Sequence, residues 1–249
     1  MKQIYKSAVT LSTLLLASLT IFAQSQSRDD VLKQIEAKRA ELAKLEKTYL
    51  APTEEDQARY ATLLKQSGTG LIRLLPREKF DTEVYKDHAK SIVMRGGGSY
   101  YSFTRLTHEY GYGSDIELDH GDFLVGFAGA DYGFLTNLGD VPIESVGMDT
   151  HAVAIFAAYK PPREEPLVRR EYQRLSPSAD MDGLQVSRRV GVQSDSTYLL
   201  RSINFRESDV LVVFRVLHID ADDSVVIVWK MLKKFGKPDF VAAKPVEIG

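Results

Sequence analysis

Three apolar segments near the end of the chain decide the fold: STYLLRSINF at 196–205, DVLVVFRVLHI at 209–219 and VVIVWKM at 225–231. Each has the apolar character of a strand. The second and third are joined by DADDS at 220–224, and aspartates are typical of turns because they hydrogen-bond to nearby backbone. Since these connections are too short for crossover helices, the three segments predict an antiparallel meander.

Further strands are expected upstream of this meander. The segments 115–119 and 123–127 predict a β-hairpin whose turn centres on His120-Gly121. The apolar run at 151–159 favours a buried strand, and its alanines leave a short buried helix open. The charged stretch at 163–174, where arginines and glutamates alternate, is interpreted as a salt-bridged surface.

Helical patterns precede the strands. A helix is expected over 29–50, with one apolar stripe made by Val31, Ile35, Leu42, Leu45 and Tyr49. A second helix is expected to begin at Thr53, a good N-cap followed by acidic residues. The stripe resembles a coiled-coil seam of about two to three heptads. It favours docking on the chain's own domain, with self-association through residues 29–50 as the alternative.

These patterns predict the α+β class: an N-terminal helical segment followed by a mostly antiparallel β domain. We expect the helical segment at 26–68, the β-rich domain at 69–240 and a C-terminal tail at 241–249. The sequence leaves sandwich and barrel both open.

The first 25 residues have the character of an export signal. Lys2 and Lys6 supply a positive start, an apolar run follows over 8–23, and Ala23 and Ser25 are small residues suited to a cleavage site. The run is shorter than the roughly 20 residues of a spanning helix, which favours cleavage over a retained anchor. We therefore expect a periplasmic or secreted protein with no membrane insertion after cleavage.

Composition excludes several classes of function. The net charge is −2, from 32 basic and 34 acidic residues, so no excess of positive charge favours nucleic acid. Cysteine is absent, which excludes a thiol nucleophile, a zinc-thiolate site and a lipoprotein anchor.

Aromatic residues and glycines concentrate between residues 96 and 139, and two interpretations of this segment are possible. Tyrosines can stack on a sugar ring, so a ligand-binding or glycan-binding face is one candidate, formed by Tyr100, Tyr101, Tyr110 and Tyr112. The favoured interpretation is that these aromatic residues fill a β core.

The segment 108–120 is the most site-like part of the chain. Its candidate metal ligands are His108, Glu109, Asp115, Glu117, Asp119 and His120. On a strand, Asp115, Glu117 and Asp119 project from one face, where their oxygens suit calcium. The favoured interpretation is instead a solvated outer face opposite a packed apolar face.

No motif in the sequence specifies a reaction. The favoured function is an exported, non-enzymatic, β-rich protein that binds a partner protein or a small ligand. The first alternative is an exported hydrolase, metal-assisted, using the His108–His120 segment; the second is a glycan-binding module. No cofactor is expected, with calcium or zinc as the alternatives. His218 and the Asp220–Ser224 turn are interpreted as ordinary strand and turn residues.

Overall fold

The computed structural model describes residues 27–81, 96–108, 110–111, 113–127 and 131–241. The expected signal peptide lies outside this part, as does all but the first residue of the expected tail. The chain divides into two compact units, residues 1–45 and 46–249.

The first unit contains most of α1, a continuous helix over Arg28–Tyr49 that agrees with the predicted one. Asp29 and Asp30 lie in its first turn and Lys47 in its last, which is the favourable arrangement for the helix dipole. Across the part of the chain that the structure describes, no helix combines the length and apolar character that crossing a membrane requires.

The second unit begins with short helices. The helix α2, Glu54–Arg59, starts at the predicted N-cap, where Thr53 and Asp56 form a reciprocal capping box. A single 3-10 turn, η1, follows at Leu63–Lys65. Tyr60 and Leu63 are buried in the core, so this segment is fastened to the body of the unit.

The centre of the second unit is a five-stranded antiparallel sheet of order β1-β11-β10-β9-β5. The predicted meander forms three of its strands, with Val213 of β10 paired to Leu199 of β9 and Lys230 of β11. The strand bounds are β1 Thr69–Leu74, β5 Tyr132–Gly139, β9 Thr197–Asn204, β10 Ser208–Ile219 and β11 Val225–Lys234.

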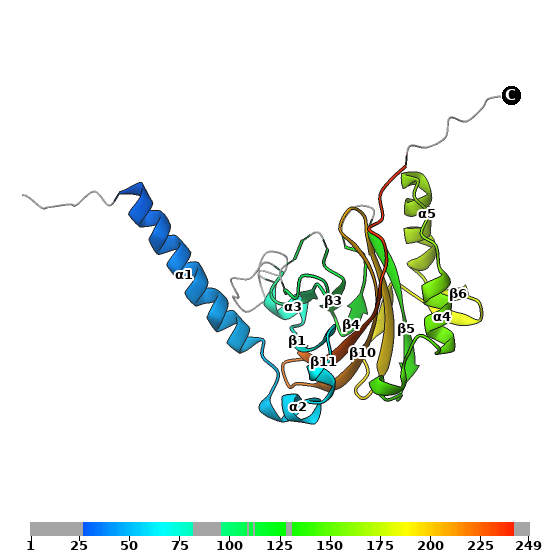
Figure 1. Ribbon diagram of the computed structural model, residues 1–249, viewed down its shortest axis with the longest axis horizontal. Helices are drawn as coiled ribbons and strands as arrows, with labels where there is room; N and C mark the ends of the chain where they lie inside the picture. The colour runs from blue at the N-terminus through cyan, green and yellow to red at the C-terminus, as the bar shows by residue number, and fades with distance from the viewer. Residues whose placement is uncertain (1–26, 82–95, 109, 112, 128–130, 242–249) are drawn as a thin grey trace, which may run out of the picture. The chain divides into compact units, whose positions relative to one another are not determined.

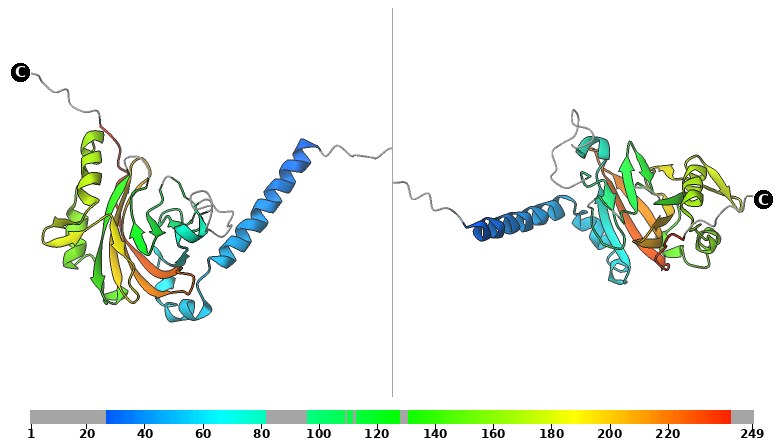
Figure 2. Two further views of the ribbon diagram at one scale, coloured as in Figure 1. Left: turned by 180° about the vertical axis from the view of Figure 1, so that it is seen from behind. Right: turned by 90° about the horizontal axis from the view of Figure 1, so that it is seen from above.

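A layer covers each face of this sheet, which explains why its strands are apolar on both sides. Helices α4 (His151–Ala158) and α5 (Glu165–Leu175) lie on one face, and strands β3 (Ile116–Asp119) and β4 (Asp122–Leu124) lie on the other (Figure 1). The same arrangement is visible from behind (Figure 2). In β10, Leu211 and Val213 join the core beneath the helices, while Val212 and Phe214 join the core beneath the second sheet.

The second sheet has four strands in the order β2-β3-β4-β8, all antiparallel. Their bounds are β2 Tyr100–Tyr101, β3 Ile116–Asp119, β4 Asp122–Leu124 and β8 Arg189–Gly191. The remaining elements are α3 Arg77–Phe80, η2 Ile143–Ser145, and the hairpin of β6 Ala179–Met181 with β7 Leu184–Val186. An α+β chain with a mostly antiparallel β domain was predicted, and the structure confirms it.

The run at 151–159 differs from its prediction, because His151–Ala158 form the helix α4 and not the expected strand. Ala152, Val153 and Phe156 of this helix pack into the core against the sheet. A short run that is apolar on every side has no clear period, so its spacing cannot distinguish a buried strand from a buried helix.

Two surface segments follow their predictions in part. The charged stretch at 163–174 forms most of α5, where Arg169 pairs with Glu165 and Arg174 with Glu171. These are salt-bridged surface residues as expected, although a helix was not. The 220–224 segment is the predicted turn, with the Asp223 amide donating to the carbonyl of Asp220.

Candidate metal centre

The predicted hairpin places the candidate site at its tip. Strands β3 and β4 are joined by His120 and Gly121, whose φ angles are 51° and 75°. Positive φ at both positions is the geometry of the two-residue turns whose twist matches antiparallel strands. The hairpin therefore projects the side chains of Asp119 and His120 at the end of β3.

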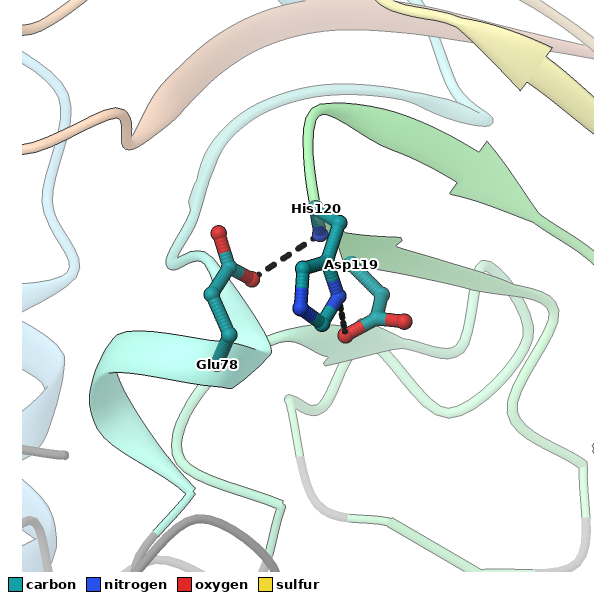
Figure 3. A group of neighbouring side chains, drawn as sticks. All are labelled: Glu78, Asp119 and His120. Carbon is teal, nitrogen blue, oxygen red and sulfur yellow. Dashed lines mark hydrogen bonds and ion pairs between the residues drawn. The ribbon is translucent and has the colours of Figure 1, made fainter. Parts of the chain in front are cut away.

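The short helix α3 brings a third ligand to this tip. It begins directly after its N-cap residue Pro76, whose backbone is extended. Glu78 of α3 accepts a hydrogen bond from the backbone N–H of His120, with 2.9 Å between Oε2 and N. Figure 3 shows the His120 imidazole between the two carboxylates, with Glu78 directed at the backbone nitrogen of His120 and Asp119 at the ring nitrogen Nδ1.

The three side chains form a compact group of ligand atoms. One ligand atom each from Glu78, Asp119 and His120 lies within 4.8 Å of the other two. His120 Nδ1 lies 3.0 Å from Asp119 Oδ1. In a tetrahedral zinc site with ligand bonds of about 2.0–2.1 Å, two ligand atoms are about 3.3 Å apart. The 3.0 Å between His120 and Asp119 is close to this spacing, and the Glu78 carboxylate is bonded to the His120 backbone N–H.

The burial of the group is graded, which suits an ion that arrives from solvent. The Asp119 side chain is 10% exposed and that of His120 is 55% exposed. Arg189 of β8 lies beside the site, with its Nη2 at 3.5 Å from Asp119 and its Nη1 at 3.0 Å from Asp122. This guanidinium compensates part of the negative charge and opposes a second cation at the same carboxylate.

Behind the tip, charged groups fasten α3 to β3. Arg77 donates to Glu117 at 2.8 Å and to Asp81 at 3.2 Å. Burial raises the pKa of Glu117, and the hydrogen bond from Tyr100 and the charge of Arg77 oppose that rise. Glu117 is therefore occupied by Arg77 and Tyr100 and is not a member of the ligand group.

The expectation of a solvated face on β3 is wrong. Asp115, Glu117 and Asp119 are all buried. Asp115 accepts from the backbone N–H of Phe103 at 2.8 Å and from the amide of Asn204 at 3.0 Å, and burial raises its pKa to about 7. All four residues of β3 are buried. Asp115 and Glu117 therefore bind separate protein donors and do not line a shared calcium site with Asp119.

His108 also lies apart from the group of three. Its Nε2 is 2.9 Å from the carbonyl oxygen of Arg73 on β1, and its ring contacts that of Tyr101 edge-on. Burial lowers the pKa of His108 to about 4, so the ring is neutral near pH 7. Glu109, the remaining predicted ligand, lies outside the described residues.

The predicted tyrosines are mainly core residues where the structure describes them. Tyr100 and Tyr101 are buried, so neither offers an open ring face to a sugar. Tyr110 is half-buried, with its ring centroid 4.7 Å from that of Tyr100. Tyr112 lies outside the described residues.

Two members of this group, Asp119 and His120, are among the candidate ligands named from the sequence, and Glu78 is not. The signal for Glu78 was weak, because it lies 42 residues before His120 in a four-residue helix. Comparison of the chain with models of protein families, with curated proteins and with solved structures yields no match.

Proposed function

We propose that this protein is exported and acts as a non-enzymatic binding protein whose small ligand is a divalent metal ion of the zinc class. Export is supported by the first 25 residues, which begin with positive charge, continue as an apolar run and end with small residues suited to cleavage. The observation that carries the metal proposal is the convergence of Glu78, Asp119 and His120 ligand atoms within 4.8 Å.

The ligand types favour zinc and its neighbours over calcium. Imidazole nitrogen suits zinc, nickel, copper and iron, whereas calcium takes six to eight oxygen ligands, as a rule. The group provides one imidazole and two carboxylates, which leaves one tetrahedral position for water.

A metal-assisted hydrolase and a glycan-binding module have less support. A metal-assisted hydrolase would need a second acid or base within hydrogen-bond reach of the metal-bound water. His108 and Asp115 were expected to contribute, but both are bonded to protein groups elsewhere. A sugar-stacking surface would need open tyrosine rings, and Tyr100 and Tyr101 are buried.

Isothermal titration calorimetry on the metal-free mature chain tests the proposal, with Zn²⁺ and Ca²⁺ titrated separately. We expect one zinc ion per chain and much weaker calcium binding. Glu78→Gln and His120→Asn should each weaken zinc binding at least about tenfold, which corresponds to about 1.4 kcal/mol. Asparagine is chosen at position 120 because it tolerates the positive φ of that turn.

Matched controls are Glu144→Gln and His151→Asn, which change an exposed carboxylate and an exposed imidazole outside the group. Zinc binding should be unchanged in both. Equal loss in the control variants and the site variants, or no stoichiometric zinc binding by the unmodified chain, would refute the proposed metal centre.

A further inference from the structure

A second cluster of titratable groups lies away from the metal centre, around His218 near the end of β10. Both ring nitrogens of His218 face carboxylates. Nδ1 is 2.8 Å from Asp220 Oδ1, while Nε2 is 3.1 Å and 3.2 Å from the two oxygens of Asp56. Asp56 belongs to α2 and precedes His218 by 162 residues, so the imidazole joins two distant parts of the chain.

This geometry requires two protons on the ring. A neutral imidazole carries one N–H donor and one acceptor nitrogen. Ionised carboxylates are acceptors only, so a neutral ring would leave one nitrogen lone pair against a carboxylate oxygen. Only the doubly protonated imidazolium donates to Asp56 and Asp220 together.

The surrounding groups hold both carboxylates in place. Asp56 accepts from the hydroxyl of Thr53 at 2.6 Å and from its backbone N–H at 3.2 Å. Asp220 pairs with Arg73 of β1 at 2.7 Å. The other charged groups of this turn are directed elsewhere: Asp222 accepts from Ser224, and Asp223 pairs with Lys79.

We propose that Asp56, His218 and Asp220 form a pH-sensitive latch, which fastens α2 to the end of β10 while the imidazole is doubly protonated and loosens α2 when the imidazole loses a proton. The latch shares no residue with the proposed metal centre. Its action is local, because Tyr60 and Leu63 remain buried in the core directly after α2. We therefore expect a loosened α2 and not an unfolded protein.

The direction of the pH dependence follows from the two pKa shifts. Burial opposes protonation of His218, but Asp56 and Asp220 outweigh it and raise the pKa of this histidine above 6.5. The stabilisation that protonated His218 gives to the latch is therefore complete below about pH 6.5. It is lost as the pH rises through the raised pKa of His218. Burial opposes ionisation of Asp56, but Thr53 and His218 lower its pKa. The stabilisation that ionised Asp56 gives is lost as the pH falls through its lowered pKa. The latch is therefore closed at pH values between the pKa of Asp56 and the pKa of His218.

Amide hydrogen exchange, corrected for intrinsic rates, measures this latch directly. The reporter amide is that of Gln57, which donates to the carbonyl of Thr53 across the first turn of α2. We expect its protection to fall at least about fivefold between pH 6 and pH 8.5, relative to amides in the centre of β10. An NMR titration of the His218 ring should give a pKa above 6.5.

His218→Gln tests the assignment, because glutamine keeps one donor but cannot titrate. This variant should show low α2 protection at both pH values, and Asp220→Asn should lower the pKa of His218. His151→Asn, which changes an exposed imidazole on α4, should keep the pH dependence of the unmodified protein. Constant α2 protection in the unmodified protein, or a pH dependence that survives in His218→Gln, would overturn the latch.

Discussion

The buried ion pair between Arg201 and Asp209 allows a quantitative test of how the central sheet is held to α4. Arg201 of β9 is 1% exposed and donates twice to Asp209 of β10, at 2.6 Å and 2.9 Å. Its third nitrogen donates at 2.7 Å to the carbonyl of Phe156, in the last turn of α4. The guanidinium also lies 3.3 Å from the ring centroid of Phe235.

Removing one partner leaves the other charge buried without compensation. Arg201→Met and Asp209→Leu should each lower the free energy of unfolding by about 3–5 kcal/mol, the usual cost of breaking a buried pair. The double variant leaves no unpaired charge, although the Phe156 carbonyl still loses its donor. We expect it to be more stable than the sum of the single losses predicts, by about 3 kcal/mol.

Urea unfolding followed by circular dichroism gives the four free energies of this double-mutant cycle. The control is Arg169→Met, which breaks the exposed pair with Glu165 and should cost at most about 1 kcal/mol. If the double variant lost the full sum of the two single effects, or if Arg201→Met cost no more than Arg169→Met, the reasoning on charge burial would be refuted.

Two further predictions concern the first helix and the sheet. The self-association alternative for the apolar stripe of α1 predicts that light scattering shows a concentration-dependent oligomer, which the double substitution Ile35→Asp and Leu42→Asp abolishes; a strictly monomeric unmodified protein would contradict this alternative. Gly70→Ala should destabilise the fold by about 1–3 kcal/mol in urea unfolding, since an added Cβ would lie 2.5–2.7 Å from indole atoms of Trp229. Gly111→Ala is its control, because the added Cβ there meets nothing within 4 Å, and equal stability losses would exclude the steric explanation.

The elements that were predicted correctly are those with local signals. The His120-Gly121 turn, the Thr53 cap and the Asp220–Ser224 turn each depend on residues close together in sequence. The meander was predicted correctly because connections this short can join only antiparallel neighbouring strands.

The environment of the site could not be predicted in the same way. Alternation places Asp115, Glu117 and Asp119 on one face of β3, but whether that face meets solvent depends on which elements cover the strand. Arg77 covers Glu117 from a helix 40 residues earlier, and Asn204 reaches Asp115 from a strand 89 residues later. The pairing of His218 with Asp56 spans 162 residues and is likewise set by tertiary packing.

The two edges of the five-stranded sheet share a feature that bears on aggregation. The N–H and C=O groups on an unprotected edge strand can recruit a strand from another molecule. On β5, both backbone groups of Leu135 are bonded to Ser187, at 2.7 Å and 3.0 Å. On β1, the Arg73 carbonyl is bonded to the neutral ring of His108. Each edge strand thus has a backbone group already taken by its own chain, which opposes the strand-by-strand growth of fibrils from folded molecules.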